Sequence, residues 1–179
     1  AKENEMKLGF VSAILDGWTF EEMMDTAAGL GYECVEAACW PQGKAERRYA
    51  GVSHIDVDND SRGYVAHIHE TCKKTGISSR TGVAISALAY YPNTMDGDFQ
   101  KREDAIRHLK KVIAFSEKLG IGMVTTFVGR DQTKSVEENL EAFSRIWPPI
   151  IQYAEEHGVR IAIENCPMLF GREQWPGGH

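Results

Sequence analysis

The feature that most constrains the fold of this sequence is a glycine that ends a helical segment shortly before an apolar strand, four times along the chain. Successive glycines are separated by 45, 44 and 38 residues. Glycine is favoured there because it readily adopts the left-handed conformation that ends a helix. Short links from helix to strand imply right-handed crossovers and a parallel sheet. The four positions are Gly31, Gly76, Gly120 and Gly158.

Apolar runs and helix-start signals predict the other elements. Two helices begin with the S/T-x-x-E spacing of a capping box, at Thr19 and at Ser135. Asp98 is the predicted cap of a further long helix. Strands are expected at about 7–12, 34–39, 83–89, 123–128 and 159–163, and helices at about 20–30, 61–74, 98–119 and 136–157.

This alternation predicts an α/β fold but fits two architectures. One is a (β/α) barrel and the other is a five-stranded doubly wound sheet. The long excursions of the chain follow strands and the tight links follow helices. Both architectures share this arrangement, so loop length does not choose between them.

Composition excludes several classes of function. The chain of 179 residues is 42% hydrophobic and 26% charged, which is ordinary for a globular domain. Its net charge of −6 argues against nucleic acid and anionic membrane partners. No apolar run reaches the roughly 20 residues of a membrane helix, and the polar start resembles no signal peptide. A cytoplasmic location is expected. The four cysteines form no C-x-x-C pair, and Cys34 and Cys39 are expected to be buried free thiols.

The strand expected at 159–163 ends in a carboxylate. Its apolar run is typical of a strand buried on both faces, and Glu164 and Asn165 follow directly. Pro167 prevents further pairing. Ligands bind at the carboxyl ends of parallel strands, so Glu164 is the first candidate for a functional residue.

Several short motifs appear in order along nearly the whole chain, and none of them is specific alone. Together they resemble the sugar phosphate isomerase/epimerase group of the xylose-isomerase-like TIM barrels. The motifs are MKLGFV at 6–11, VEAACWP at 35–41, HIDV at 54–57, ISALAYYPN at 85–93, TTFVGR at 125–130, WPP at 147–149 and IAIENCPM at 161–168.

The resemblance implies an eight-stranded barrel, of which residues 1–179 would be one domain holding the N-terminal part, about five strands and four helices. Strands six to eight have no counterpart in this sequence. We therefore expect a truncated or cleaved product, or an incomplete chain, of a protein nearer the roughly 250 residues usual for the fold.

The resemblance also implies a divalent metal ion and a proton-transfer reaction. In the family pattern the glutamate ending strand five is a metal ligand and a catalytic acid/base, which assigns both roles to Glu164. The other ligands come from strands six to eight. The implied activity is isomerisation or epimerisation of a sugar, sugar phosphate or keto-sugar through a metal-stabilised enediolate. The metal is Mn²⁺, Mg²⁺, Co²⁺ or Zn²⁺, since one carboxylate does not define a coordination sphere.

Further residues near predicted strand ends are candidate substrate contacts. Aromatic side chains there would form a wall against the sugar, with packing beneath loops as the alternative. Arg130 would meet an anionic substrate group, and Asn165 would orient hydroxyl groups or the following turn. His108 and His157 lie on predicted outer helices and are expected to be solvated. The substrate-binding candidates are Trp40, His54, Tyr90, Tyr91, Thr126, Arg130, Asn165, Trp175 and His179.

Three alternatives to an isomerase stay open. A lyase or dehydratase acting on a keto-sugar or cyclitol begins with the same proton abstraction. A half-barrel without activity of its own would act as a subunit or be a fragment. An endonuclease IV-like phosphodiesterase is disfavoured by the acidic charge. Expected partners are a small sugar or its derivative and either a second copy or the missing half of the barrel, with no nucleic acid and no membrane.

Overall fold

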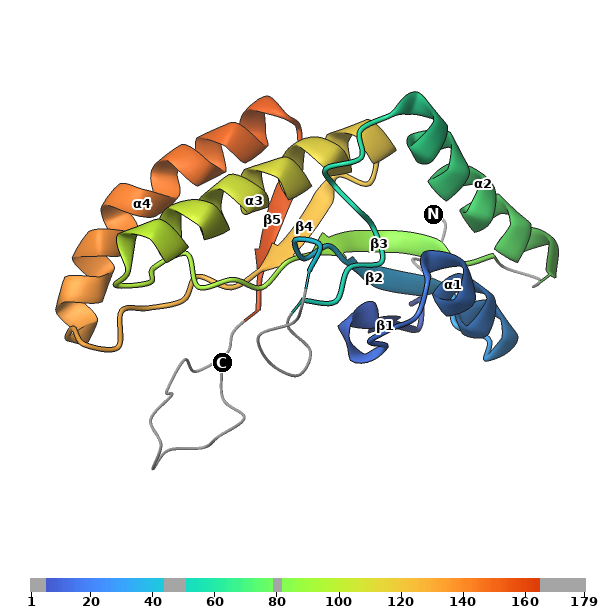
Figure 1. Ribbon diagram of the computed structural model, residues 1–179, viewed down its shortest axis with the longest axis horizontal. Helices are drawn as coiled ribbons and strands as arrows, with labels where there is room; N and C mark the ends of the chain where they lie inside the picture. The colour runs from blue at the N-terminus through green and yellow to red at the C-terminus, as the bar shows by residue number, and fades with distance from the viewer. Residues whose placement is uncertain (1–5, 44–50, 79–81, 165–179) are drawn as a thin grey trace. The chain divides into compact units, whose positions relative to one another are not determined.

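A computed structural model describes residues 6–43, 51–78 and 82–164 of the chain (Figure 1). The chain forms two compact units. The first comprises residues 1–89 and 118–121, and the second comprises 90–117 and 122–179. Each unit is described by itself.

The first unit contains a parallel sheet in which β2 lies between β1 and β3. Gly9 of β1 pairs with Cys34 of β2, and Cys34 pairs with Ala84 of β3. A register shift interrupts the second ladder between Val35 and Glu36. The elements of this unit are β1 (Gly9–Val11), the 3₁₀ helix η1 (Ser12–Ile14), α1 (Phe20–Gly29), β2 (Cys34–Ala38), α2 (Arg62–Ser78) and β3 (Ala84–Ala89).

The second unit is built from two long helices and two paired strands. β4 and β5 run parallel, in register from Met123 opposite Arg160 to Thr126 opposite Ile163 (Figure 1). The elements are α3 (Phe99–Leu119), whose last two residues group with the first unit, then β4 (Met123–Thr126), α4 (Val136–Glu156) and β5 (Arg160–Ile163).

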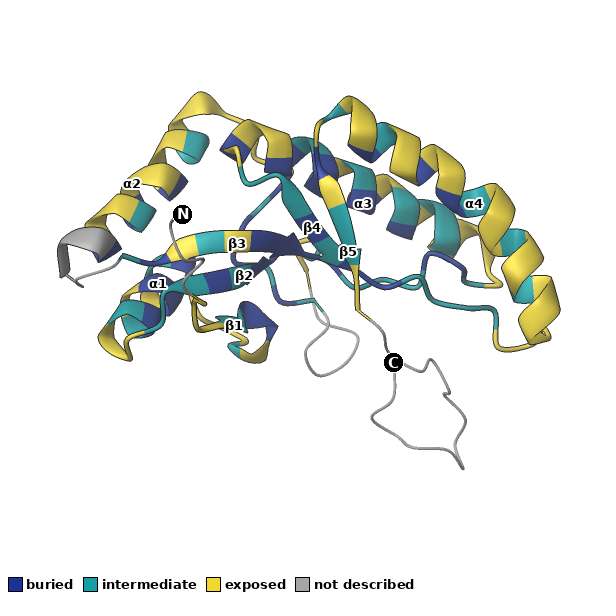
Figure 2. Ribbon diagram, turned by 180° about the vertical axis from the view of Figure 1, so that it is seen from behind, coloured by how far each residue is buried: buried dark blue, intermediate teal, exposed yellow. Residues whose placement is uncertain are grey.

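The helices bury one stripe and leave the other face to solvent, as Figure 2 shows for the outer side of α4. This pattern follows from the 3.6-residue period of their apolar side chains. Large side chains dominate the buried stripe, and burying each one contributes roughly 1.5–3 kcal/mol. The buried helical residues include Met23, Met24 and Ala27 of α1, Leu109, Val112, Ile113 and Phe115 of α3, and Trp147, Ile150 and Ala154 of α4.

The predicted capping boxes are confirmed at both helices. The Thr19 hydroxyl accepts a hydrogen bond from the Glu22 amide, and the Glu22 carboxylate accepts one from the Thr19 amide. Ser135 and Glu138 make the same reciprocal pair at the start of α4. Each box satisfies two amides that have no partner within the helix.

The prediction is wrong for one of the four glycines that were expected to end a helix. Gly31, Gly120 and Gly158 have φ of +82°, +68° and +64°, as expected of helix ends. Gly76 instead lies inside α2, which continues to Ser78, and the positive φ before β3 belongs to Gly82, at +68°.

Thr75 accounts for this displaced link between α2 and β3. Its buried hydroxyl donates to the Cys72 carbonyl at 2.7 Å, which suits a helical turn. The same oxygen accepts from the Val83 amide at 3.3 Å, which anchors the chain just before β3.

The prediction that His108 is solvated is also wrong. His108 on α3 is only 6% exposed and meets the ring of Tyr90 edge-on, with centroids 4.6 Å apart. The periodic pattern of α3 did not reveal this contact because Tyr90 lies 18 residues earlier. His157, at the end of α4, forms an ion pair with Glu117 at 2.6 Å.

Cys34 and Cys39 are free thiols, as predicted, and so is Cys72; Cys39 is buried as expected, whereas Cys34 is only partly buried. Burial raises the pKa of the Cys39 thiol well above its ordinary value, so this side chain stays neutral. Among the helices of the described residues, none combines the length and the apolar character needed to cross a membrane.

Replacing Ser135 with alanine is expected to destabilise the protein by about 1 kcal/mol, because the Glu138 amide loses its acceptor. Thermal or denaturant unfolding of the full-length protein measures this loss. Ser144→Ala is the matched control, since Ser144 is exposed within the same helix and its hydroxyl bonds only the Glu141 carbonyl in the structure. Equal stability of the two variants would contradict the role of the cap.

Candidate functional site

Main-chain hydrogen bonds bring together three of the predicted site residues at the carboxyl ends of strands in the second unit. The Tyr90 amide donates to the Thr125 carbonyl at 3.1 Å, and the Glu164 amide donates to the Thr126 carbonyl at 3.0 Å. Each bond extends a parallel ladder just beyond the end of its strand. Tyr90, Thr126 and Glu164 therefore lie at one edge of this unit.

Glu164 is exposed at this edge, directly after β5. The residue before it, Ile163, is 48% exposed although it belongs to the strand. An exposed carboxylate held at a fixed backbone position offers hard oxygen atoms to a ligand.

Tyr90 and Thr126 are buried. Burial raises the pKa of the Tyr90 phenol, and its ring packs against His108. The Thr126 hydroxyl donates to the Phe127 carbonyl at 3.3 Å. Tyr91 is half-buried and its ring lies 4.7 Å from that of Phe127. The structure thus gives Tyr90 and Thr126 internal partners and leaves Tyr91 partly accessible.

The loop after β4 is fastened to the loop after β3 by two side chains. The Asn93 amide group donates to the Arg130 carbonyl at 2.9 Å, and the buried Thr94 hydroxyl donates to the Val128 carbonyl at 2.7 Å. The side-chain Oδ1 of Asn93 accepts from the Met95 amide at 3.1 Å. We call these contacts of Asn93 and Thr94 the loop latch.

Gly129 is required at the centre of the loop latch. Its φ of +82° is unfavourable for residues with a β-carbon. A β-carbon there would also collide with the Asn93 side chain. Gly97 makes a second close approach, since a β-carbon on it would lie 2.8 Å from Oδ2 of Asp131. The two loops therefore meet through glycine backbone.

Arg130 extends from this fastened loop, and its guanidinium is incompletely satisfied. Its Nε atom is buried and has no hydrogen-bond partner within the described residues. Its Nη2 atom makes one long bond, 3.5 Å, to the Lys134 carbonyl. A buried N–H without a partner carries a free-energy cost.

The two loops enclose a polar hollow of about 440 Å³. This volume is within the range of small-molecule sites. Three carboxylates and one guanidinium contribute to its wall, together with amide and hydroxyl groups. We refer to it as the loop hollow, and its lining residues are Asn93, Asp96, Gly97, Asp98, Arg130, Asp131, Gln132 and Thr133.

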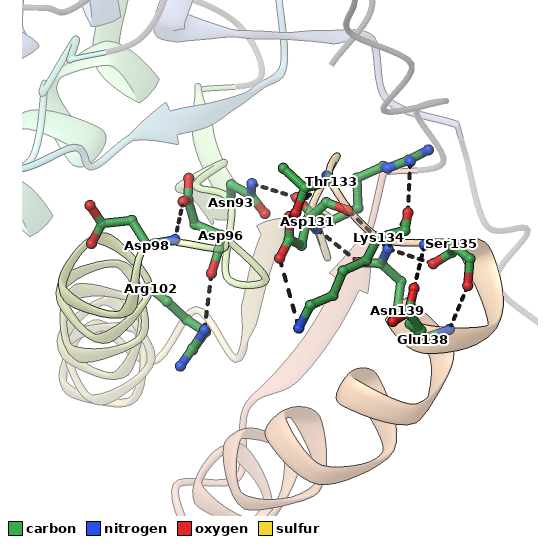
Figure 3. Close-up of polar contacts among 11 residues, drawn as sticks. Asn93, Asp96, Asp98, Arg102, Asp131, Thr133, Lys134, Ser135, Glu138 and Asn139 are labelled. Atoms are coloured by element: carbon green, nitrogen blue, oxygen red, sulfur yellow. Dashed lines mark hydrogen bonds and ion pairs between the residues drawn. The ribbon is translucent and has the colours of Figure 1, made fainter.

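Each aspartate of the loop hollow is held by its own loop (Figure 3). Oδ1 of Asp96 accepts from the Asp98 amide at 2.8 Å, and Oδ1 of Asp98 accepts from the Gln100 amide at 2.9 Å. Oδ1 of Asp131 accepts from the amide and the hydroxyl of Thr133, and these bonds lower the pKa of the Asp131 carboxyl. The orientation of each of these carboxylates is thereby fixed by its own turn.

Sequence reasoning identified Arg130 but missed the other residues of the loop hollow. The available signal was the run of Asn and Asp after two predicted strands, whose side chains bond amides two residues ahead. That signal predicts turns, and it does not reveal that the two turns face each other.

Two predicted site residues lie in the first unit. Trp40 is half-buried and packs against a cluster of Ala13, Ala38 and Val52. His54 is buried, with Nδ1 2.8 Å from the Ser12 hydroxyl and Nε2 3.2 Å from the Leu15 carbonyl. Both ring nitrogens of His54 thus have internal partners, and burial lowers its pKa.

Asn165, Trp175 and His179 lie outside the described residues. Within the described ranges, no three His, Cys, Asp or Glu side chains converge to hold a metal ion.

Comparison with known families identifies the fold independently. The sequence profile of the family described as "Xylose isomerase-like TIM barrel" matches residues 24–175. No curated protein shows significant similarity to this chain.

Several solved structures share the fold. D-psicose 3-epimerase from Clostridium cellulolyticum H10, solved with D-tagatose, is 15% identical in sequence to this chain, with a TM-score of 0.59. The match covers 88% of this chain and 52% of the epimerase chain. A xylose isomerase-like TIM barrel protein from Mycobacterium smegmatis, in complex with magnesium, is 11% identical with a TM-score of 0.60, covering 90% and 55%. The probable 3-DHS dehydratase AsbF from Bacillus anthracis is 13% identical with a TM-score of 0.60, covering 90% and 53%.

This chain therefore spans about half the length of the solved structures that it matches. At these identities the likeness concerns the fold. It confirms the predicted TIM-barrel class, with five strands and four α-helices in the described residues.

Replacing Gly129 with alanine is expected to cost more stability than replacing Gly122, whose φ is +70° but whose surroundings are open. Gly122→Ala introduces backbone strain of about 1–2 kcal/mol. Gly129→Ala adds the collision with Asn93, so its unfolding midpoint should be lower. In an Asn93→Ala background the extra cost of Gly129→Ala should shrink but not vanish, because the β-carbon would still lie 2.9 Å from Cα of residue 93. Equal costs for the two glycines in the wild-type background would refute the steric role of Gly129.

Lowering the pH should destabilise the protein because of His54. Its pKa in the folded protein lies below the ordinary value of 6.5. As the pH falls through 6.5, His54 is protonated in the unfolded chain but still neutral in the folded protein. This difference lowers the free energy of unfolding until the pH reaches the pKa of His54 in the folded protein. Melting of the full-length protein at pH 7.5 and 5.5 should show a larger drop for wild type than for His54→Gln, which does not titrate. An equal drop in both proteins would contradict this prediction.

Proposed function

Because this chain belongs to the xylose isomerase-like TIM barrel family, we propose that the protein is a divalent-metal-dependent isomerase or epimerase of a sugar or sugar derivative. The reaction moves a proton on a carbon next to a carbonyl group. The sugar epimerases among the structures with this fold support this class of reaction.

The observation that carries the proposal is the position of Glu164. Its carboxylate is exposed directly after β5, and its amide is fixed to the Thr126 carbonyl at 3.0 Å. Barrel enzymes carry their catalytic groups at such strand ends. Family patterns and chain geometry thus point to the same residue.

Glu164 fits a hard divalent ion as one ligand, because carboxylate oxygens are the preferred donors of Mg²⁺ and Mn²⁺. The magnesium complex of the Mycobacterium smegmatis protein supports such an ion. A bound ion polarises the carbonyl oxygen of a substrate. The further ligands are proposed to come from parts of the protein outside the described residues. The metal could be Mn, Mg, Co or Zn.

The proposed role of Glu164 in the reaction is that of a base and then an acid. Its carboxylate takes the proton from the carbon beside the carbonyl and later returns a proton to substrate. A carboxylate is suited to this exchange because it is ionised before it takes the proton and neutral until it returns one.

Contacts with the sugar are proposed for residues that keep accessible surface or lie outside the described ranges. They are Trp40, Tyr91, Arg130, Asn165, Trp175 and His179. Tyr90, Thr126 and His54 are buried and hydrogen-bonded or packed internally. We propose that these three support the site by holding the backbone around it.

A dehydratase is the second candidate, favoured by the likeness to the probable 3-DHS dehydratase. It would begin with the same proton abstraction and then expel a hydroxyl group. We also propose that the chain assembles with a second copy or with the remainder of a barrel. Its proposed location is the cytoplasm.

Glu164→Gln in the full-length protein should lower turnover by about 10³-fold or more, since general acid–base catalysis contributes typically 10²–10⁴-fold. Incubation of ketohexoses in D₂O should give deuterium at the carbon beside the carbonyl with wild type. Appearance of an ultraviolet-absorbing enone, with release of water, instead of simple exchange would identify the dehydratase.

Glu155→Gln is the matched control, because Glu155 is an exposed carboxylate near the end of α4. It should leave turnover unchanged. Elemental analysis should also find less bound divalent metal in Glu164→Gln than in Glu155→Gln. Full activity and full metal content in Glu164→Gln would overturn the proposed role of this residue.

A further inference from the structure

The side chain and backbone of His54 join three segments of the first unit. Nδ1 of the ring lies 2.8 Å from the Ser12 hydroxyl, directly after β1, and Nε2 lies 3.2 Å from the Leu15 carbonyl, directly after η1. The His54 amide donates to the Ala38 carbonyl, at the end of β2, at 2.9 Å. We call these contacts the His54 clamp, and they hold the loop after β2 against the carboxyl ends of two strands.

The partners of the clamp determine where its hydrogens lie. The Leu15 carbonyl can only accept, so Nε2 of His54 carries the hydrogen between them. Nδ1 of the neutral ring is then an acceptor, and the Ser12 hydroxyl donates to it. The Ser12 oxygen accepts in turn from the Ala38 amide at 2.9 Å. Each of these hydrogens therefore has an acceptor as long as His54 is neutral.

A proton added to His54 disrupts this arrangement. Nδ1 would then also donate, and the Ser12 oxygen would have to accept from it while the Ser12 hydrogen lost its acceptor. Ser12 is fully buried and His54 is only 4% exposed, so water cannot replace the lost partner in the closed loop. Because a buried donor without a partner is unfavourable, the protonated clamp is weaker than the neutral one.

We propose that the His54 clamp is an acid-sensitive device: protonation of His54 makes residues 52–57 open away from the ends of β1 and β2 more often, while the sheet of the first unit stays folded. This loop pairs with the sheet through an isolated bridge between Ser53 and Cys39 rather than through a continuous ladder. Its opening therefore does not require the strands to separate. Buried apolar side chains keep the closed form the major one, and they belong to Val52, Ile55 and Val57.

The other titratable groups near the clamp do not replace His54 as its acid-sensitive member. From α2, the Tyr64 phenol accepts from the Asp56 amide at 2.9 Å, and burial raises the pKa of this phenol, so it stays neutral in acid. The Asp56 carboxylate accepts from an amide two residues ahead at 3.0 Å. Burial also raises the pKa of the Cys39 thiol, directly after β2. Asp16, after η1, acts on His54 electrostatically and favours the protonated ring.

The sign of the effect follows from burial. Burial lowers the pKa of His54 in the closed form below the ordinary value of 6.5, and the Leu15 carbonyl and Asp16 oppose this shift. In the open loop the ring meets water and its pKa returns to the ordinary value. The open form therefore binds the proton more tightly, and opening becomes more frequent as the pH falls from 6.5 toward the pKa of the closed form.

Nitrogen-15 NMR of the full-length protein tests the hydrogen positions. At pH 7.5 the ring of His54 should carry its hydrogen on Nε2 and none on Nδ1. A hydrogen on Nδ1 at this pH would overturn the proposal, since Ser12 could then not donate to the ring.

Amide hydrogen exchange between pH 6.5 and pH 5 tests the opening itself. After correction for the intrinsic rate, protection of the Ala38, His54 and Ile55 amides, which bond within the clamp, should fall by up to about tenfold per pH unit. The Met24 amide, inside α1, should keep its protection because the unit stays folded. Constant protection at Ala38, or an equal fall at Met24, would overturn the proposal.

His54→Gln should remove the pH dependence at Ala38, because glutamine does not titrate. Should this variant fail to fold, the comparison of Ala38 with Met24 in the wild-type protein decides alone. His67→Gln is the matched control, since it removes an exposed histidine of the same unit that pairs with Glu21. It should leave the pH dependence of the wild-type protein unchanged. An equal pH dependence at Ala38 in the two variants would overturn the proposal.

Discussion

Main-chain hydrogen bonds that continue the parallel ladders just past the strand ends determine where chemistry can occur in this protein. The Glu164 amide bonds the Thr126 carbonyl, and the Tyr90 amide bonds the Thr125 carbonyl. Pairing in a parallel ladder fixes the direction of the chain as well as its spacing. Each strand consequently releases its loop at the same edge of the second unit, and the amide bond of Glu164 holds its backbone there.

The loop latch converts this backbone constraint into a shaped wall. Two side-chain donors, from Asn93 and Thr94, reach carbonyls 37 and 34 residues away. A β-carbon on Gly129 would collide with the Asn93 side chain that makes the first of these bonds, and the φ of +82° at this position also disfavours one. Stability of the loops and placement of Arg130 therefore depend on the same few atoms.

Local signals in the sequence were sufficient to predict most helices and strands, but not to predict the contacts between loops. The boxes at Thr19 and Ser135 are complete within four residues, so their prediction needed no tertiary information. Gly76 and Gly82 stand in similar local sequence, and only the bonds of Thr75 decide which one ends the link. The hydrogen bond between Asn93 and Arg130 joins residues far apart in the sequence, and no spacing rule predicts it.

One oxygen of each aspartate in the two loops is held by the turn to which that aspartate belongs. In Asp131, Oδ1 is held by Thr133, which lowers the pKa of the carboxyl, while Oδ2 faces Gly97. A carboxylate restrained at one oxygen loses little further rotational freedom when the other accepts a hydrogen bond. A turn that would form for local reasons alone thus supplies an ordered acceptor at no additional conformational cost. The same argument applies to Asp96 and Asp98, whose Oδ1 atoms bond amides two residues ahead, and it explains how short polar loops can build a site on a scaffold whose core is elsewhere.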